Sequence, residues 1–188
     1  MRLDSKTESF LGNCYPRFVY RVKNTFKDVY AKYGLEMKVT EGVRSFRKQN
    51  ELYMIGRENI AGQNVPRRTI VTNALPGLSY HQYGLAIDAC FQGKDPFLEK
   101  LDIYVSKLIW EDYGRFAENN GLIWGGKFKF RDMPHIELNT SFTVKELKLI
   151  LEHQSIQGVW SAIDVLMGES GKEWMGENAS FKPLDPRA

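Results

Sequence analysis

Apolar residues recur at helical spacing towards both ends of the chain. In residues 17–34, RFVYRVKNTFKDVYAKYG, the apolar positions fall near every third or fourth residue, and Gly34 is a usual helix stop. Thr143 is a typical helix cap ahead of a similar pattern at 144–154, and residues 156–168 continue in the same way. The pattern therefore predicts helices at the two ends.

The middle of the chain carries shorter runs of the kind found in strands. These runs predict strands at residues 36–41, 85–91, 122–124 and 135–138. Helical spacing returns in residues 46–57, which close at Gly56, and in residues 96–121, which predict one long helix or two. Residues 58–78 are rich in Gly, Pro and Asn and predict a long loop, and the tail at 177–188 is expected to be irregular.

Composition favours an ordinary globular protein. The 188 residues, 43% of them hydrophobic, suit one domain over residues 1–188 with a sizeable core. The net charge is +3, and Lys and Arg are interleaved with Asp and Glu, which argues against nucleic-acid binding but suits an anionic polymer such as bacterial cell wall. Cys14 and Cys90 have no metal or redox spacing and are predicted to be buried free thiols.

Residues 1–18 carry scattered charges and no apolar core, so they do not predict a signal peptide. No stretch of the sequence is long and apolar enough to predict a membrane span. We therefore expect a protein that is made in the cytoplasm, does not insert into membranes, and needs another route to any target outside the cell.

The run SYHQYGLAID, residues 79–88, places a histidine and an aspartate among aromatic or apolar neighbours. In a helix, His81 and Asp88 would lie about 10 Å apart along the axis, too far to share a metal that bonds each ligand at about 2 Å. Gly84 allows a bend instead, with His81 on a loop and Asp88 on the following strand. A carboxylate in an apolar strand needs a partner.

A second unusual run is WGGKFKFRDMPHIEL, residues 124–138. Pro134 disfavours helix at the residue before it, so the chain is expected to enter a strand on which His135 and Glu137 share a face. Asp132 would lie at the entrance of that strand. Two imidazoles and one carboxylate with an open fourth position form the ligand set of a catalytic zinc.

On spacing alone, these residues also have ordinary structural interpretations. A lone histidine is usually a surface or core residue. Asp88 could cap a strand end or form a salt bridge, and Asp132 could be a turn residue before proline. His153 lies in a helical pattern without a partner motif and is expected to be structural or exposed. Pattern alone leaves these alternatives open.

Three runs together resemble the zinc D-Ala-D-Ala carboxypeptidase family, the VanY-like enzymes that include phage endolysins. SYHQYGLAID resembles the family's S-x-H-x-x-G-x-A-x-D signature, and WGGKFKFRDMPHIEL is similar to its W-G-G-x-(few)-D-x-P-H signature. EGVRSFRKQNELYMIGR, residues 41–57, is similar to its G-x-R-S-x-x-x-Q-x-x-L-Y-x-x-G-R segment. The resemblance covers about residues 15–140, and residues 141–188 are expected to form a helical extension packed on that part.

The resemblance implies that His81, Asp88 and His135 hold zinc and that Asp132 is the general base. Zinc would act as a Lewis acid and lower the pKa of its water, while Asp132 would take the proton and return it to the leaving amine. Glu137 shares the face of His135 and is the rival base. The motif position favours Asp132 and places Glu137 beside the ligands or in the substrate groove.

The resemblance also implies which residues bind substrate. Arg44 would bind or polarise the scissile carbonyl and stabilise the oxyanion, and Ser79 and Gln49 would line the substrate groove. The implied fold is α+β, with a small, mainly antiparallel sheet, helices packed on it, and the zinc site at the edge of the sheet.

The implied function is hydrolysis of the peptidoglycan stem peptide by a monomer. LYMIGRENIAG and VTNALPGLSYHQYGLAID resemble the L-alanyl-D-glutamate endopeptidase branch, so we expect cleavage of the L-Ala–D-Glu bond, with Arg57, Arg67 and Arg68 available for free carboxylates of the peptide. One alternative is a D,D-carboxypeptidase or dipeptidase that releases terminal D-Ala. Another is a zinc-binding module without catalysis, against which Asp132 and Arg44 argue because a binder needs neither.

Overall fold

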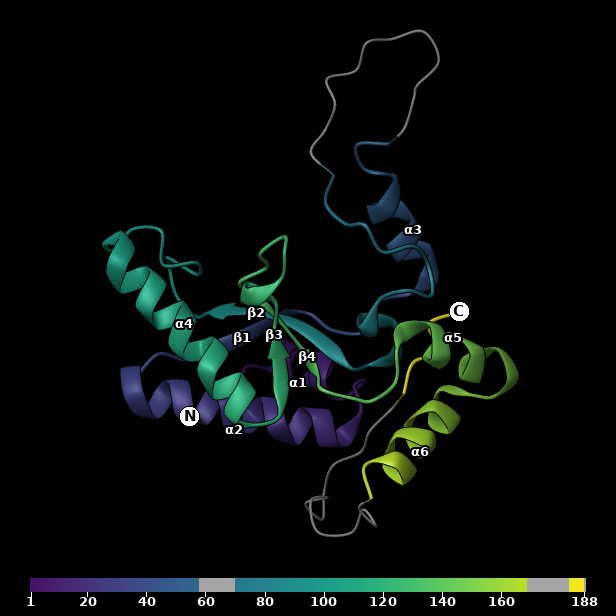
Figure 1. Cartoon of the computed structure of the whole chain (residues 1–188). Helices are drawn as coiled ribbons and strands as arrows, with labels where there is room; N and C mark the ends of the chain where they lie inside the picture. Colours follow the sequence, from purple (N-terminus) through teal and green to yellow (C-terminus); the bar gives the residue numbers. More distant parts are fainter. Residues whose placement is uncertain (58–69, 169–182, 188) are drawn as a thin grey trace, which may run out of the picture.

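The structure is a computed structural model and describes residues 1–57, 70–168 and 183–187 (Figure 1). Its α-helices are α1 (Ser5–Leu11), α2 (Pro16–Tyr33), α3 (Phe46–Met54), α4 (Ile103–Asn119), α5 (Val144–His153) and α6 (Ile156–Leu166). Its strands are β1 (Met37–Glu41), β2 (Ala86–Phe91), β3 (Leu122–Trp124) and β4 (His135–Leu138), with 3-10 turns η1 (Tyr80–Tyr83) and η2 (Gly125–Lys127). The predicted α+β fold class is confirmed.

The four strands form one antiparallel sheet in the order β1-β2-β4-β3. Side chains alternate along β2, so Ile87 and Phe91 are fully buried on one face while Asp88 points from the other. The strand register places Asp88 opposite Glu41 on β1 and opposite His135 on β4. A row of polar side chains therefore crosses three strands of the sheet.

Helices α2 and α4 pack against each other and against the sheet, α2 on β1 and α4 on β3. Buried residues recur along α2 every three or four positions, as in Phe18, Val22 and Phe26, and this confirms the predicted helix. The helix begins with Pro16, whose missing N–H costs nothing there, and stops at Gly34, where φ is 66°. The sheet and these two helices enclose the main apolar core.

Two helices begin at aspartate caps that the sequence pattern does not reveal. The helix expected over 96–121 starts only after Asp102, whose carboxylate accepts the backbone N–H of Tyr104 at 2.9 Å. The pattern does not predict α1, which begins after Asp4, whose carboxylate accepts the N–H of Thr7 at 2.7 Å. In both cases a side-chain hydrogen bond fixes the start of the helix.

The remaining boundaries agree with expectation, with one small difference. α3 ends at Met54, short of the expected stop at Gly56. Residues 70–78 form neither helix nor strand, as expected for a loop. Residues 58–69 of the predicted loop lie outside the described residues, as do 169–182, which include part of the tail expected to be irregular.

The C-terminal helices contact the rest of the fold directly. α5 begins with a capping box between Thr143 and Glu146, which confirms the predicted cap. From α6, Trp160 donates its indole N–H to the carbonyl of Tyr83 at 2.8 Å. The carboxylate of Asp164, also on α6, accepts the hydroxyl of Tyr15 at 2.5 Å.

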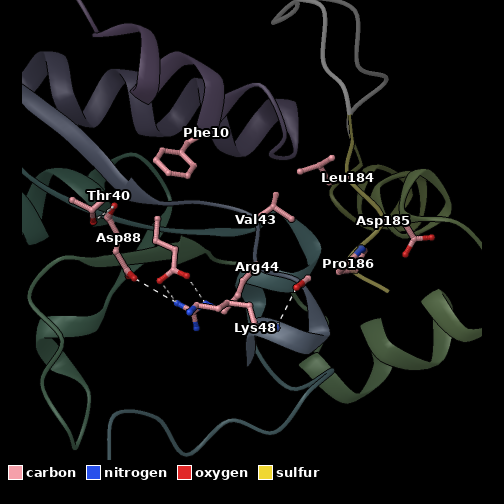
Figure 2. Close-up of a pocket in the computed structure, with 11 residues that line it drawn as sticks. Phe10, Thr40, Val43, Arg44, Lys48, Asp88, Leu184, Asp185 and Pro186 are labelled. Carbon is pink, nitrogen blue, oxygen red and sulfur yellow. Dashed lines mark hydrogen bonds and ion pairs between the residues drawn. The ribbon is translucent and has the colours of Figure 1, made fainter. Parts of the chain in front are cut away.

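Residues 183–187 return to the start of α3 (Figure 2). The backbone N–H of Phe46 donates to the carbonyl of Pro186 at 2.7 Å. Arg187 donates through Nη1 to the carbonyl of Leu151 at 2.9 Å, near the end of α5. Both contacts satisfy backbone groups that a helix end leaves unpaired, so this segment ties the start of α3 to the end of α5.

Cys14 and Cys90 are buried and unbridged, which confirms the predicted free thiols. Among the described helices, none has both the length and the apolar character that crossing a membrane requires.

Trp124 is held between two glycines. A Cβ at Gly114 of α4 would lie 2.1 Å from the Trp124 ring, and a Cβ at Gly126 would lie 2.2 Å from it. The indole N–H donates to the carbonyl of Met133 at 2.9 Å. Trp124 therefore fixes residues 125–133 against α4, and these residues lead the chain into β4.

Gly114→Ala tests this packing. Alanine normally stabilises a helix interior over glycine by about 0.5–1 kcal/mol, but here the added methyl group would overlap Trp124. We expect the free energy of unfolding, measured by chemical denaturation, to fall by about 1–3 kcal/mol, the usual cost of overpacking. Ser106→Ala in the same helix is the control and should change it by less than about 0.5 kcal/mol. A stabilised Gly114→Ala protein would contradict the packing.

Candidate active site

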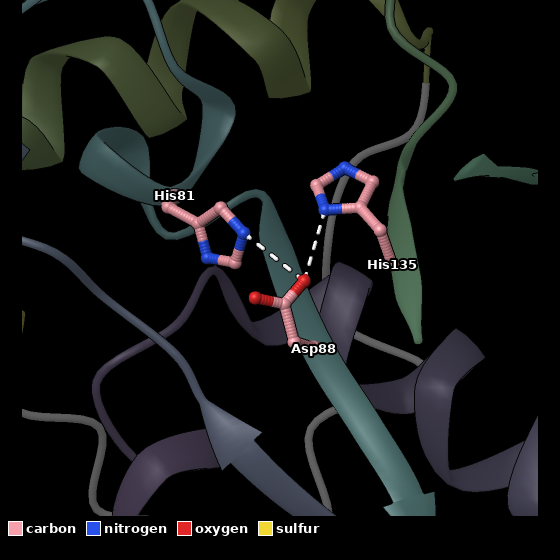
Figure 3. A group of neighbouring side chains, drawn as sticks. All are labelled: His81, Asp88 and His135. Carbon is pink, nitrogen blue, oxygen red and sulfur yellow. Dashed lines mark hydrogen bonds and ion pairs between the residues drawn. The ribbon is translucent and has the colours of Figure 1, made fainter. Parts of the chain in front are cut away.

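Three side chains from three elements converge in Figure 3: His81 from η1, Asp88 from β2 and His135 from β4. Asp88 Oδ1 lies 3.4 Å from His81 Nε2 and 3.1 Å from His135 Nδ1. All three candidate ligand atoms lie within 4.8 Å of one another. A tetrahedral zinc with bonds of about 2.0–2.1 Å separates its ligands by about 3.3 Å. The structure thus brings together the three residues predicted as ligands, in a group that fits one ion.

Gly84 makes this convergence possible. It ends η1 with a φ of 68°, in the left-handed region that favours glycine. A Cβ there would also lie 3.1 Å from the Cα of Cys14. The chain therefore bends between His81 and Asp88, as the sequence predicts.

The second ring nitrogen of each histidine has a fixed partner. His81 Nδ1 lies 2.9 Å from the carbonyl of Gly42, which can only accept, so Nδ1 carries the proton. His135 Nε2 lies 2.9 Å from the carboxylate of Glu137, its neighbour on the same face of β4. Such partners orient metal-binding imidazoles and fix their tautomers. In both rings the nitrogen that faces Asp88 is therefore the one that a metal would bind.

The charges in this group favour a bound cation. Burial alone would raise the pKa of Asp88, but hydrogen bonds to His135 and His81 hold that pKa well below its usual range. Burial would lower the pKa of His135, but hydrogen bonds to Asp88 and Glu137 raise it to about 9. Without a metal, the group therefore binds a proton strongly. A bound metal ion would replace that proton and supply the positive charge.

Asp132 lies beside these residues with a free carboxylate. It lines a groove of about 760 Å³ together with His81, Asp88 and His135. Within the described part of the chain, no side chain or backbone N–H hydrogen-bonds to its carboxylate, whereas Glu137 is engaged with His135. Desolvation, and then the nearby Asp88 carboxylate, raise the pKa of Asp132. The shift moves its pKa towards the neutral range in which a general base works best.

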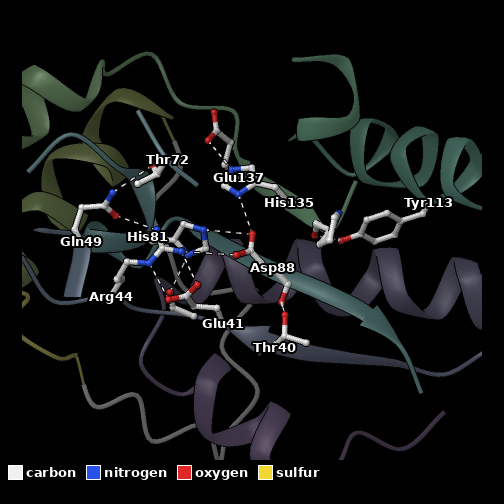
Figure 4. A network of polar contacts seen from close by, with 12 residues as sticks. Thr40, Glu41, Arg44, Gln49, Thr72, His81, Asp88, Tyr113, His135 and Glu137 are labelled. Atoms are coloured by element: carbon white, nitrogen blue, oxygen red, sulfur yellow. Dashed lines mark hydrogen bonds and ion pairs between the residues drawn. The ribbon is translucent and has the colours of Figure 1, made fainter. Parts of the chain in front are cut away.

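Arg44 is fixed between Glu41 and Gln49 (Figure 4). Its Nε and Nη2 donate to the two carboxylate oxygens of Glu41 at 2.8 and 2.5 Å, and its Nη1 donates to Gln49 Oε1 at 2.9 Å. Nη2 also lies 3.7 Å from Asp88 Oδ2. The backbone N–H of Arg44 donates to the carbonyl of His81 at 3.2 Å. Main chain and side chain together place Arg44 against the candidate ligands.

Ser79 and Gln49, both predicted to line the substrate groove, occupy different positions. Ser79 lines the groove directly before η1. Gln49 is fully buried, is not among the residues that line the groove, and donates through Nε2 to the carbonyl of Ala74 at 2.7 Å. Gln49 therefore reaches the groove only through Arg44 and through residues 70–78.

Two residues of the site are not expected from the sequence pattern. One is Glu41, which binds Arg44. The alternation of apolar and polar residues in 36–41 assigns Glu41 to the same face of the strand as Met37, away from Arg44. Phe128 lines the groove, and its ring centroid lies 5.7 Å from that of His135. The alternation of Phe and Lys after the Gly-Gly pair is a weak signal for Phe128, because spacing does not show where a loop packs.

Of the three basic residues expected to be available for carboxylates of the substrate, only Arg57 is among the described residues. Arg57 donates through Nη1 to the carbonyl of Thr72 and through Nη2 to Asn73 Oδ1, both at 2.8 Å, so it holds the loop that lines the groove. Arg67 and Arg68 lie outside the described residues.

A second cavity, of about 640 Å³, adjoins the groove (Figure 2). Glu41, Arg44 and Asp88 line both spaces. On its other sides the second cavity is bounded by Phe10 of α1 and by Leu184 in the C-terminal segment. Open space therefore borders the candidate site in two places.

The sequence is similar to a known protein family and to a characterised peptidoglycan endopeptidase. A family model described as D-alanyl-D-alanine carboxypeptidase matches residues 72–138. The peptidoglycan L-alanyl-D-glutamate endopeptidase CwlK of Bacillus subtilis is 38% identical over 120 residues, which cover 61% of this chain and 68% of CwlK. The family match includes the three candidate ligands and Asp132.

Two solved structures are similar to this fold. One is the L-Ala D-Glu endopeptidase ChiX of Serratia marcescens, with a TM-score of 0.46 and 23% identity over 73% of this chain and 90% of ChiX. The other is a variant of the vancomycin resistance D,D-pentapeptidase VanY in complex with Zn(II), with a TM-score of 0.47 and 18% identity over 76% of this chain and 81% of VanY.

Metal binding tests the candidate ligands. His81→Ala and His135→Ala should each abolish binding of one zinc per chain, because either change leaves two of three ligands. Glu137→Gln should weaken zinc binding by about ten- to a hundredfold, the usual cost of losing a partner that orients a ligand. Zinc content and affinity are measured by atomic absorption and by competition with a chelator.

His153→Ala is the matched control, because this exposed third histidine lies at the end of α5. It should bind zinc as the unaltered chain does. Full zinc occupancy in the His81→Ala/His135→Ala double variant would refute the assignment.

Proposed function

The chain belongs to the M15 family of peptidases, and from that membership we propose that it is a zinc enzyme that hydrolyses the L-Ala–D-Glu bond of the peptidoglycan stem peptide. The observation that carries the proposal is the meeting of His81, Asp88 and His135 beside the free carboxylate of Asp132. Hydrolytic zinc sites combine three protein ligands, an open position and a nearby acid. The bond is proposed from CwlK, the relative named as an L-alanyl-D-glutamate endopeptidase.

Zinc bound by the three candidate ligands would supply Lewis acidity and a water of lowered pKa. Asp132 faces the same groove and would accept the proton of the attacking water and return it to the leaving amine. Glu137 would keep His135 in the tautomer that leaves Nδ1 free. The two acids thus have separate tasks, set by which of them already has a partner.

Substrate contacts would come from Arg44 and from the wall of the groove. Arg44 is held close to Asp88 and would donate to the carbonyl oxygen of the scissile amide, where negative charge develops. Ser79 and the loop residues 70–74 line the same groove and would contact the backbone of the peptide. A donor fixed in advance needs no rearrangement during the reaction.

The charges around the groove favour an internal bond over a terminal one. A terminal D-Ala carboxylate is bound best by a fixed cation with no other partner. Apart from the candidate ligands, the cations among the described residues that line the two cavities are Arg44 and Lys48. Arg44 is paired with Glu41, and Lys48 Nζ lies 3.4 Å from Glu51. A D,D-carboxypeptidase would therefore lack a dedicated anchor among these residues.

The remaining features of the proposal concern the whole chain. We propose that residues 1–188 act as one peptidase domain and as a monomer, with α5 and α6 as a packed extension. The substrate would be reached after release or export by another route. A zinc-binding module without catalysis would have no use for the free carboxylate of Asp132 in the groove.

Substitution of Asp132 and of Glu137 shows which of the two acids is the general base and which one orients His135. Asp132→Asn should keep zinc but lower kcat on purified peptidoglycan by about a hundredfold or more, the usual scale of general acid–base catalysis. Glu137→Gln, assayed at saturating zinc, should lower kcat by less, because its task is to orient His135. The opposite ranking would make Glu137 the base.

The products identify the bond. Purified cell wall digested by the zinc-loaded protein should yield new N-terminal D-Glu, detected by mass spectrometry of the muropeptides after N-terminal labelling. A synthetic peptide that ends in D-Ala-D-Ala, without the L-Ala–D-Glu bond, is the matched substrate control and should remain intact. Release of D-Ala alone would replace the proposal with the D,D-carboxypeptidase alternative.

A further inference from the structure

A β-bulge sets the position of Glu41. Val39 pairs with Ala89 and Glu41 pairs with Asp88, so Thr40 is the extra residue in β1. In an unbroken ladder, Thr40 would face Asp88 and Glu41 would point to the other side with Val39. The hydroxyl of Thr40 instead donates to the backbone carbonyl of Asp88 at 3.1 Å. The bulge therefore brings Glu41 onto the face that carries the candidate metal ligands.

On that face, Glu41 occupies one whole edge of the Arg44 guanidinium. Nε and Nη2 form this edge, and each donates to a different oxygen of the carboxylate, which is the strongest geometry for such a pair. Gln49 takes one N–H of Nη1. The N–H groups that remain are on Nη1 and Nη2, and Nη2 lies 3.7 Å from Asp88. The edge of Arg44 that stays available is therefore the one nearest the candidate ligands.

Two carboxylates compete for this guanidinium. Glu41 holds it at hydrogen-bond distance, while Asp88 Oδ2 is farther away at 3.7 Å. Without Glu41, the attraction of Asp88 would have no counterweight, and Arg44 would turn onto it. A carboxylate bound by a guanidinium is a poorer ligand for a metal, because the guanidinium on Oδ2 offsets the negative charge that would attract the metal ion to Oδ1.

We propose that Glu41 is a positioning residue for Arg44: it keeps the guanidinium off Asp88 and presents the Nη1–Nη2 edge to the carbonyl oxygen of the bound peptide. Both oxygens of Glu41 are engaged, so it serves neither as a metal ligand nor as the base. The effect on substrate rests on the proposed function. The effect on metal binding rests only on the geometry of Glu41, Arg44 and Asp88.

Zinc affinity, measured by chelator competition without substrate, tests the first half. Glu41→Ala should weaken zinc binding by about tenfold, within the range for residues that support a metal ligand, and Glu41→Gln should fall between it and the unaltered chain. Arg44→Ala should then raise zinc affinity more in the Glu41→Ala chain than in the unaltered chain, because only there has Arg44 turned onto Asp88. Equal gains in both backgrounds would overturn the proposal.

Kinetics with a soluble muropeptide, at saturating zinc, test the second half. Glu41→Ala should lower kcat by about tenfold or more, with a smaller change in KM, and should cost nothing further in an Arg44→Ala chain. Glu51→Ala removes an exposed acid of α3 that pairs with Lys48, and it should leave both zinc affinity and kcat unchanged. Thermal unfolding of each variant checks that the fold is retained.

The outcomes separate the two proposals. If the unaltered chain fails to cleave peptidoglycan, the proposed function fails, and the zinc measurements still decide the role of Glu41. If it cleaves, but the losses from Glu41→Ala and Arg44→Ala simply add, Glu41 acts independently of Arg44 and the positioning role is refuted.

Discussion

The carboxylate of Asp88 is the constraint on which the rest of the structure depends. It sits on β2, a strand whose other face is fully apolar, and a carboxylate in such a place is stable only with partners. His81 and His135 meet one of its oxygens, and Arg44 lies near the other, as Figure 4 shows. His81 comes from η1, His135 from β4, and Arg44 from the loop between β1 and α3. The fold can therefore be described by the local features that bring these side chains together at one point.

Those features are local, and each has a different physical basis. Gly84 bends the chain between His81 and β2, and the bulge at Thr40 turns Glu41 towards Arg44. Gly125 has no room for a side chain, because a Cβ there would lie 2.6 Å from the carbonyl of Asp132. Trp124 then fixes this loop against α4. Two glycines, a bulge and a buried indole thus place the candidate ligands, the base and the guanidinium around Asp88.

Most elements, and the convergence of His81, Asp88 and His135, could be predicted because their determinants are local in sequence, whereas their role as metal ligands follows from the family resemblance. The spacing around Gly84 and the two-residue period from His135 to Glu137 carry the necessary geometry in themselves. The role of Glu41 could not be predicted, because strict alternation assigns it to the apolar face and only pairing with β2 reveals the bulge. The burial of Gln49 likewise depends on contacts with residues distant in sequence. The starts of α1 and α4 depend on side-chain caps at Asp4 and Asp102, which the hydrophobic pattern does not show.

The most direct test of a metal centre built on Asp88 is a crystal structure of the zinc-loaded protein with anomalous scattering at the zinc edge. We expect one ion bonded to His81 Nε2, His135 Nδ1 and one oxygen of Asp88 at about 2.0–2.2 Å, with Glu137 still bound to His135 Nε2 and Arg44 still paired with Glu41. An ion bonded to His135 Nε2 or to Glu137, or one placed away from Asp88, would contradict it.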